Sequence, residues 1–221
     1  MQAKTVLYKR VEEVSSGYPK TRGLASSKAR DLITKRCLQA LNNNYVVELG
    51  AFKGAVSTRL ATVCKLNNKK PVICVDTWEG AEQEEQKKLE GYVGKSASQS
   101  LAEFVDYIEK CGLKEWVIPI PTTTRKAAGI IDCDIDYLFV DACYYYENVL
   151  EDVLSWVPRI VPGGIVTFDD FGCWGGSKGP EGAVRELILN NPKHFQSFTN
   201  PPDTCEVGNV ISFRVLKKWC P

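Results

Sequence analysis

Carboxylates follow two apolar runs in the second half of the chain, where they could hold a cation or share a proton. Asp141 comes directly after the β-prone run 137–140, and Asp169 and Asp170 follow the apolar run 165–168. Between these runs, apolar residues recur at helical spacing. A strand–helix–strand unit of this length joins parallel strands, whose carboxyl ends meet at one edge of a sheet. We therefore expect the three carboxylates to lie together, where open α/β sheets bind ligands.

Three carboxylates at one place repel one another unless a cation, a proton or basic side chains compensate their charge. The structural alternative is that Asp169 and Asp170 cap the segment that follows them and bind nothing. Both interpretations place the pair at the end of a strand, so the spacing alone leaves them open.

A glycine turn stands in the first half of the chain. Residues 48–54 read Glu-Leu-Gly-Ala-Phe-Lys-Gly and connect a strand-like run at 45–47 to a helical pattern through 58–63. Glycines let the backbone approach a ligand closely, and the helix that follows offers free N–H groups. The spacing is not the Gly-x-Gly-x-x-Gly of dinucleotide sites. Glu48 at the head of the turn favours a ligand with a cationic amine, although a purely structural turn is an equal alternative.

A further carboxylate, Asp76, ends the next apolar run, 71–75. An acidic residue at the end of the second strand is placed to bind the hydroxyl groups of a ribose. A residue that only caps the following segment is the structural alternative.

Helical and strand patterns alternate along most of the chain, which is typical of an α/β fold with a mostly parallel sheet. Helices are expected within 26–41, 58–63, 101–108, 149–160 and 180–188, and strands at 45–47, 71–75, 116–120, 137–140, 165–168, 195–198 and 210–215. We expect the Pro-Gly-Gly at 162–164 to stop the fourth helix and the last two strands to form an antiparallel hairpin. The result is a Rossmann-like sheet of seven strands with helices on both faces.

The length of 221 residues and the apolar share of 44% suit one domain, residues 1–221. Residues 26–221 form the expected core. Residues 1–25 have no clear period, and we interpret them as a loose N-terminal arm or lid over the site.

Composition disfavours several classes of function. The net charge is +1 with no basic cluster on a recognisable motif, so we expect no nucleic-acid partner. No apolar run reaches membrane-spanning length and no signal-peptide segment is present, so we expect no membrane partner. The nine cysteines include no Cys-x-x-Cys pair and His194 is the sole histidine, which disfavours a zinc site. Cys37, Cys64, Cys74 and Cys111 fall at apolar positions of helices or strands, which indicates mostly free thiols in a cytoplasmic protein, with a disulfide or two as the alternative.

The alternating elements, the Glu-x-Gly-x-x-x-Gly turn and Asp76 resemble a class I S-adenosylmethionine-dependent methyltransferase. Val-Asp-Ala-Cys-Tyr-Tyr-Tyr-Glu at 140–147, Pro-Gly-Gly at 162–164 and Asp-Asp-Phe at 169–171 resemble more closely the macrocin O-methyltransferase group. Members of that group methylate sugar hydroxyls with a divalent metal. Their usual sequences at the corresponding positions are Asp-Gly-Asp-x-Tyr-Glu and Asp-Asp-Tyr. Here Ala-Cys replaces Gly-Asp, and Tyr144 stands where broader relatives often carry His.

The resemblance implies a set of site residues. For S-adenosylmethionine it implies Glu48, Gly50, Ala51, Gly54, Ser57, Asp76, Thr77, Trp78, Thr122 (or Thr123) and Asp141. Asp141, Asp169 and Asp170 would be catalytic and would hold Mg²⁺, or Mn²⁺ or Ca²⁺, which lowers the pKa of the acceptor hydroxyl. Asp141 could also accept the proton, and Tyr144 and Trp174 would contact the substrate.

The leading hypothesis is thus a metal-dependent O-methyltransferase of a sugar or glycan, compatible with a homo-oligomer. A catechol or phenol acceptor is the alternative, since Trp174 and the tyrosines could supply aromatic walls. A non-catalytic module that binds S-adenosylmethionine is less favoured because the glycines and all three carboxylates are intact. A nicotinamide oxidoreductase is least favoured, because of the glycine spacing.

Overall fold

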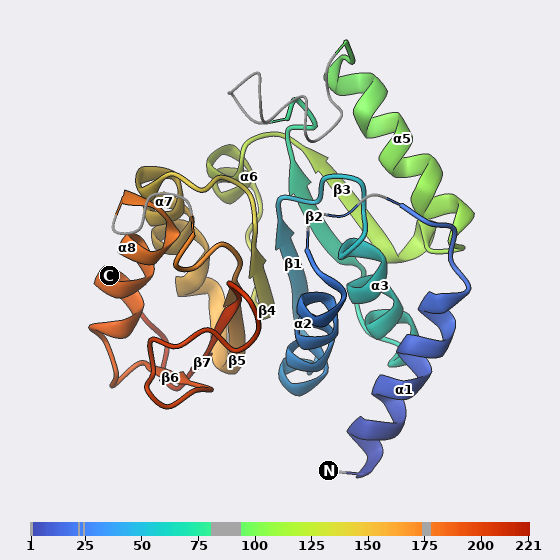
Figure 1. Cartoon of the computed structure of the whole chain (residues 1–221). Helices are drawn as coiled ribbons and strands as arrows, with labels where there is room; N and C mark the ends of the chain where they lie inside the picture. Colours follow the sequence, from blue (N-terminus) through green and yellow to red (C-terminus); the bar gives the residue numbers. More distant parts are fainter. Residues whose placement is uncertain (1, 22, 24, 81–93, 174–177) are drawn as a thin grey trace.

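The computed structural model describes the chain except residues 1, 22, 24, 81–93 and 174–177. Its described part contains a seven-stranded sheet in the order β3-β2-β1-β4-β5-β7-β6 (Figure 1). The first five strands in the sequence are parallel, and β7 runs antiparallel to both β5 and β6. This arrangement confirms the expected Rossmann-like sheet with a terminal antiparallel hairpin.

The bounds of the elements follow the expected alternation. The strands are β1 (Tyr45–Leu49), β2 (Val72–Asp76), β3 (Val117–Pro121), β4 (Ile135–Val140), β5 (Ile160–Phe168), β6 (Phe195–Ser197) and β7 (Ile211–Val215). The described helices are α1 (Gln2–Ser16), α2 (Ser27–Ala40), α3 (Ser57–Leu66), α5 (Ala97–Lys110), α6 (Thr124–Ile130), α7 (Tyr146–Trp156) and α8 (Pro180–Val184). Short turns η1 (Lys114–Trp116) and η2 (Val157–Arg159) precede β3 and β5, and the π-helical η4 (Arg185–Leu189) extends α8.

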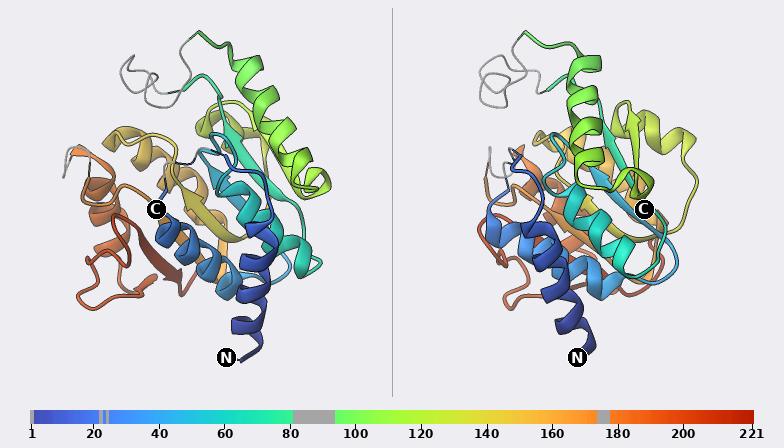
Figure 2. Two further views of the ribbon diagram at one scale, coloured as in Figure 1. Left: turned by 45° about the vertical axis from the view of Figure 1, so that its right-hand side comes forward. Right: turned by 90° about the vertical axis from the view of Figure 1, so that its right-hand side faces the viewer.

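Alternate residues of each central strand enter two separate apolar clusters, one on each face of the sheet. Val46 of β1 packs with residues of α2, α3 and α5, while Val47 packs with residues of α6, α7 and α8. The right-hand view of Figure 2 has the blue helices α1 and α2 on one side of the sheet and α6 on the other. Both faces are therefore covered, which leaves the strand ends as the open edge.

One local expectation was wrong, and two helices, α6 and α1, were not expected. Residues 162–164 do not stop a helix: α7 ends at Trp156 and η2 follows, so the Pro-Gly-Gly lies inside β5. Helix α6 was not expected, because its N-cap, Thr123, is one of three consecutive threonines and could not be singled out in the sequence. The N-terminal segment is not irregular throughout, since α1 buries Val11 completely and pairs Glu12 with Arg59 of α3.

All nine cysteines are free thiols, and the four expected at apolar positions, Cys37, Cys64, Cys74 and Cys111, are buried. Among the described helices, none combines the length and the apolar character needed to cross a membrane.

A buried carboxylate on α7 gives the fold a pH dependence. Asp152 is 2% exposed, and burial raises its pKa to about 7, against a hydrogen bond with Thr124. Its Oδ2 atom has no hydrogen-bond partner among the described residues. The folded protein holds this proton between about pH 4 and 7 while the unfolded chain has released it, so stability falls as the pH rises through that window.

Asp152→Asn is therefore expected to stabilise the protein at pH 8, by up to about 4 kcal/mol, because the amide mimics the protonated acid. The gain should vanish near pH 4. Urea denaturation at both pH values measures it, with Asp106→Asn in the exposed pair with Lys110 as the control. An Asp152→Asn variant without a pH-dependent gain would contradict the assignment.

Candidate active site

The sheet register aligns the ends of β1, β4 and β5. Leu49 lies opposite Val140, and Val140 lies opposite Phe168. The ladder continues one step further, because the Asp141 N–H donates to the Leu49 carbonyl at 2.8 Å and the Asp169 N–H donates to the Val140 carbonyl at 3.0 Å. The topology thus brings the two aspartates to the same edge, as the strand–helix–strand pattern predicts.

The carboxylates at this edge influence one another. Loss of hydration raises the pKa of Asp141 well above its usual range, and the negative charges of Asp169, Asp170, Glu48 and Asp76 raise it further. Burial also raises the pKa of Asp169, against a hydrogen bond from the Asp170 backbone. The edge therefore favours a ligand that brings positive charge or donates protons.

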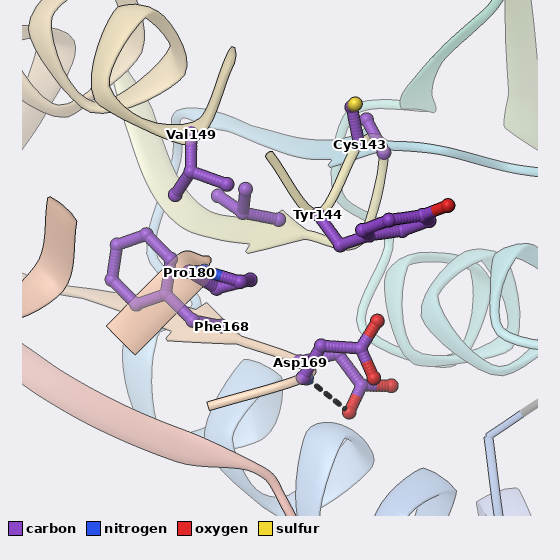
Figure 3. Close-up of a pocket in the computed structure, with 9 residues that line it drawn as sticks. Cys143, Tyr144, Val149, Phe168, Asp169 and Pro180 are labelled. Carbon is purple, nitrogen blue, oxygen red and sulfur yellow. Dashed lines mark hydrogen bonds between the residues drawn. The ribbon is translucent and has the colours of Figure 1, made fainter. Parts of the chain in front are cut away.

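A pocket with an empty volume of about 270 Å³, partly open to solvent, adjoins the pair Asp169 and Asp170. Its lining residues are Val140, Ala142, Cys143, Tyr144, Val149, Phe168, Asp169, Asp170 and Pro180. In Figure 3 the Asp169 carboxylate lies below the Tyr144 ring, while Val149, Phe168 and Pro180 gather at the other end. The pocket therefore combines a charged end, an aromatic wall and an apolar end.

The pair itself has an ordered conformation. Asp170 has a φ of 58°, in the left-handed region. Asp169 Oδ1 accepts the Asp170 N–H at 2.9 Å, and Asp170 Oδ1 accepts a hydrogen bond from Asn209 Nδ2 at 2.7 Å. These contacts fix the pair locally, as a structural cap also would.

The donor chemistry of Asp141, Asp169 and Asp170 fits a hard divalent cation, because carboxylate oxygens are its preferred ligands and their mutual repulsion would be relieved. In the described part of the chain, however, no three His, Cys, Asp or Glu side chains are grouped closely enough to hold an ion. The residues fit the cation in charge, and their present arrangement is not a formed metal site.

Gly50 makes a close backbone crossing. Its φ is 90°, and a Cβ built on it would lie 2.0 Å from the Asp141 carbonyl oxygen. At Gly54, where φ is 84°, a Cβ would lie 3.2 Å from Phe104 and Tyr107 of α5. The glycines thus serve contacts within the protein: Gly50 brings the turn against the end of β4, and Gly54 admits α5.

Glu48 lies below the turn rather than at its surface. It is 1% exposed, and its Oε2 accepts hydrogen bonds from Ser57 Oγ at 2.5 Å and Cys74 Sγ at 3.2 Å. Burial raises its pKa to about 7, against these two hydrogen bonds. Both Glu48 and Ser57, predicted to line the cofactor, are therefore committed to a buried network that joins β1, β2 and α3.

Asp76 holds two turns together. Its Oδ2 accepts the Phe52 N–H at 2.8 Å and its Oδ1 accepts the Trp78 N–H at 2.7 Å. The Trp78 ring is 1% exposed and packs on Phe104, with 5.0 Å between ring centroids. The Trp78 side chain, which the resemblance implies for the cofactor, therefore packs within the core. Backbone N–H groups of Ala51 and Thr77 also act on the Asp76 carboxylate, so its structural role uses most of its acceptor capacity.

The remaining described residues of the predicted set, Ala51, Thr77 and Thr122, follow the ends of β1, β2 and β3. Thr122 follows β3 and donates its N–H to the Asp76 carbonyl at 3.0 Å, and Thr123 caps α6. Thr77 is half-buried and Ala51 is buried at the turn. Trp174 lies outside the described residues.

The sequence interpretation missed Asn209 and the apolar end of the pocket. Val149, Phe168 and Pro180 occupy positions where apolar periodicity indicates core, and nothing in the sequence separates a pocket wall from packing. Asn209 lies in a long connection without a motif.

Known proteins resemble this chain in sequence and in fold. A family model described as a methyltransferase domain matches residues 47–171. The uncharacterized protein y4gI of Sinorhizobium fredii (strain NBRC 101917 / NGR234) is 27% identical over 154 residues, covering 62% of this chain and 15% of that protein. The match therefore spans only a small part of the curated relative.

Solved structures share the fold at low identity. The O-methyltransferase NovP superposes with a TM-score of 0.70 at 15% identity, covering 95% of this chain and 88% of that one. An O-methyltransferase from Bacillus cereus in complex with SAH gives 0.59 at 15%, covering 96% and 91%. CalS11, a TDP-rhamnose 3'-O-methyltransferase of calicheamicin biosynthesis, gives 0.58 at 16%, covering 95% and 93%.

The family model extends over more than half of the chain and includes the glycine turn, Asp76, Asp141, Asp169 and Asp170. The fold agrees with that of the solved O-methyltransferase NovP. The chain belongs to the methyltransferase domain family.

Proposed function

We propose that this chain is an S-adenosylmethionine-dependent O-methyltransferase that acts on a hydroxyl group of a sugar or glycan and uses a divalent cation, as in the macrocin group. The observation that carries the proposal is the junction of Gly50 and Asp141, which joins the glycine turn to the carboxylates at one sheet edge. Residues 1–221 would form a single methyltransferase domain.

The cofactor would bind along the turn after β1, with its sulfonium directed toward Asp141. A ligand that carries an ammonium and a sulfonium group would favour the ionised forms of Glu48, Asp76 and Asp141, because its positive charge would offset the burial and repulsion that raise their pKa values. The Bacillus cereus neighbour was solved with SAH, which is the demethylated product of this cofactor. Thr122 at the end of β3 is the candidate for the adenine contact.

The acceptor would occupy the pocket beside Asp169 and Asp170. These carboxylates accept hydrogen bonds from hydroxyl groups and orient the attacking oxygen, which is the proximity that methyl transfer requires. Asp141 would receive the hydroxyl proton once a cationic ligand has ionised it, and the burial and neighbouring charges that raise its pKa would make the ionised form a stronger base. A bound divalent cation would supply further acidification of the hydroxyl.

Two observations bear on the acceptor class. A sugar is favoured by the CalS11 neighbour, whose substrate is named as TDP-rhamnose, and by the Tyr144 ring facing a carboxylate. A catechol or phenol is the second candidate, because Val149, Phe168 and Pro180 give the pocket an apolar end. Neither acceptor requires a basic side chain in the pocket.

The N-terminal segment is proposed as a lid. The Tyr18 and Thr62 hydroxyls share a hydrogen bond of 2.7 Å, and Thr21 Oγ1 donates to the Lys53 carbonyl at 3.3 Å. These contacts carry the segment across α3 to the glycine turn, where a bound cofactor would be covered.

Cofactor binding tests the proposed function directly. We expect S-adenosylmethionine to bind with a dissociation constant in the micromolar range, which corresponds to a binding free energy on the order of −8 kcal/mol. Isothermal titration calorimetry and thermal shift measure it, with ATP as a control nucleotide without a sulfonium. If neither S-adenosylmethionine nor S-adenosylhomocysteine gives heat or a thermal shift, the methyltransferase proposal fails.

Chelation tests the cation. EDTA should suppress turnover and added Mg²⁺ or Mn²⁺ should restore it, because hard cations prefer the carboxylate oxygens available here. Initial rates with a glycoside acceptor, with and without exhaustive chelation, give the answer. Unchanged rates after chelation would leave methyl transfer standing and remove the cation from the proposal.

A further inference from the structure

The connection between β6 and β7 reaches the active-site carboxylates. It is anchored to three separate elements: Glu206 pairs with Arg36 of α2, Asp203 pairs with Arg185 of η4 at 3.1 Å, and Cys205 Sγ donates to the Phe171 carbonyl at 3.5 Å. The Arg36–Glu206 pair is largely buried, with side-chain exposures of 13% and 7%. The connection is therefore held in place before its last residues meet the site.

Asn209, near the end of this connection, contacts the side chain of Asp170 and the backbone of the next residue, Phe171. Its side-chain Nδ2 donates to Asp170 Oδ1 at 2.7 Å, while its backbone carbonyl accepts the Phe171 N–H at 2.9 Å. Two hydrogen bonds from one residue thus fix the side chain of Asp170 and the peptide that follows it. Asp170 needs such support, because a non-glycine residue with a φ of 58° is strained.

We propose that Asn209 is a positioning residue that holds the Asp170 carboxylate toward the acceptor pocket. The inference rests on the proposed methyl transfer to a hydroxyl. A neutral amide suits this task, because it donates a hydrogen bond without cancelling the negative charge that the acceptor or a cation would need. A lysine or arginine in its place would form an ion pair and compete for the same oxygen.

The experiment compares Asn209→Ala and Asn209→Asp with the control Thr204→Ala. Asn209→Asp keeps the shape of the side chain, removes the donor and adds a negative charge beside Asp170, while Asn209→Ala removes the donor without adding charge. Thr204 is exposed in the same connection and makes its hydrogen bonds there through backbone atoms. For each protein, kcat, the KM for the acceptor, the affinity for S-adenosylmethionine and the melting temperature are measured.

For both Asn209 variants we expect kcat to fall by about 30-fold to 100-fold, since a misplaced reacting group costs about this much. In Asn209→Ala, cofactor affinity and melting temperature should stay near those of the wild type, whereas Asn209→Asp should lower the melting temperature through repulsion with Asp170. Thr204→Ala should match the wild type throughout. Wild-type kcat and KM in Asn209→Asp would overturn the inference. A loss of kcat in Asn209→Ala that parallels a loss of cofactor affinity and melting temperature would also overturn it, because it would indicate a structural role.

Crystal structures of the variants separate this inference from the proposed function. In Asn209→Ala and Asn209→Asp, the Asp170 carboxylate should leave its wild-type rotamer, whether or not the protein methylates the acceptors offered. An Asp170 side chain that keeps its position in both variants would refute the positioning role. A wild-type protein without methyl transfer, but with Asp170 displaced in the variants, would refute only the proposed reaction.

Discussion

Asp169→Ala and Asp170→Ala are each expected to reduce kcat by about 100-fold or more, and the double variant should lose little beyond either single change. Groups that serve one acceptor act as a unit, so removing the first disables the second. Asp141→Ala should behave in the same way. The three carboxyl groups already interact in the structure, because the charges of Asp169 and Asp170 raise the pKa of Asp141.

Cofactor affinity separates a functional loss from a folding defect in these variants. S-adenosylmethionine should bind to Asp169→Ala and Asp170→Ala as it does to the wild type, because both residues line the acceptor pocket rather than the glycine turn. Folding should persist, since removing one carboxylate relieves repulsion among the others. The matched control is Glu147→Gln, which replaces an exposed acidic residue at the start of α7 and should keep full activity.

Steady-state rates and calorimetry on these variants are sufficient for the test. Rates near the wild type in both Asp169→Ala and Asp170→Ala would identify the pair as a cap of the loop after β5. That outcome would also agree with the hydrogen bond from the Asp170 N–H to Asp169 Oδ1, which is a capping contact.

The sheet could be predicted from the sequence because its signals are local. Apolar runs of the parallel strands end in charged or small residues, and the helices between them repeat at 3.6 residues, so the order of elements follows. The error at Pro162-Gly163-Gly164 has a physical origin. These residues terminate helices in most contexts, but β5 begins two residues earlier, where the strand is partly exposed and tolerates them.

The site could be predicted in position but not in the direction of its side chains. Glu48 and Trp78 stand beside the predicted ligand in the sequence, yet both side chains turn into the core. Strand alternation decides the first case: Glu48 shares a face with Val46 and meets Cys74 across the register. In the case of Trp78, the backbone has a φ of 54° and changes direction there, and no sequence pattern predicts that conformation for tryptophan.

The final prediction concerns Gly50, whose replacement should damage the fold more than any other single glycine substitution considered. Gly50→Ala combines a φ of 90° with a Cβ that would lie 2.0 Å from the Asp141 carbonyl oxygen, a backbone atom that cannot rotate away. The turn after β1 would have to separate from β4. We expect a loss of about 4 kcal/mol or more in the free energy of unfolding, at the upper end of single-residue effects.

Gly163 provides the matched control, because its φ is 92° and a Cβ there would have no heavy atom within 4 Å. Gly163→Ala carries only the conformational strain, about 1 to 3 kcal/mol. Urea denaturation of both variants isolates the collision as the difference between them, and a Gly50→Ala chain that does not fold while Gly163→Ala folds gives the same answer. Equal losses would mean that the turn can move away from Asp141. The cofactor turn and the acceptor carboxylates would then not be rigidly joined, and the junction on which the proposed function rests would lose its structural basis.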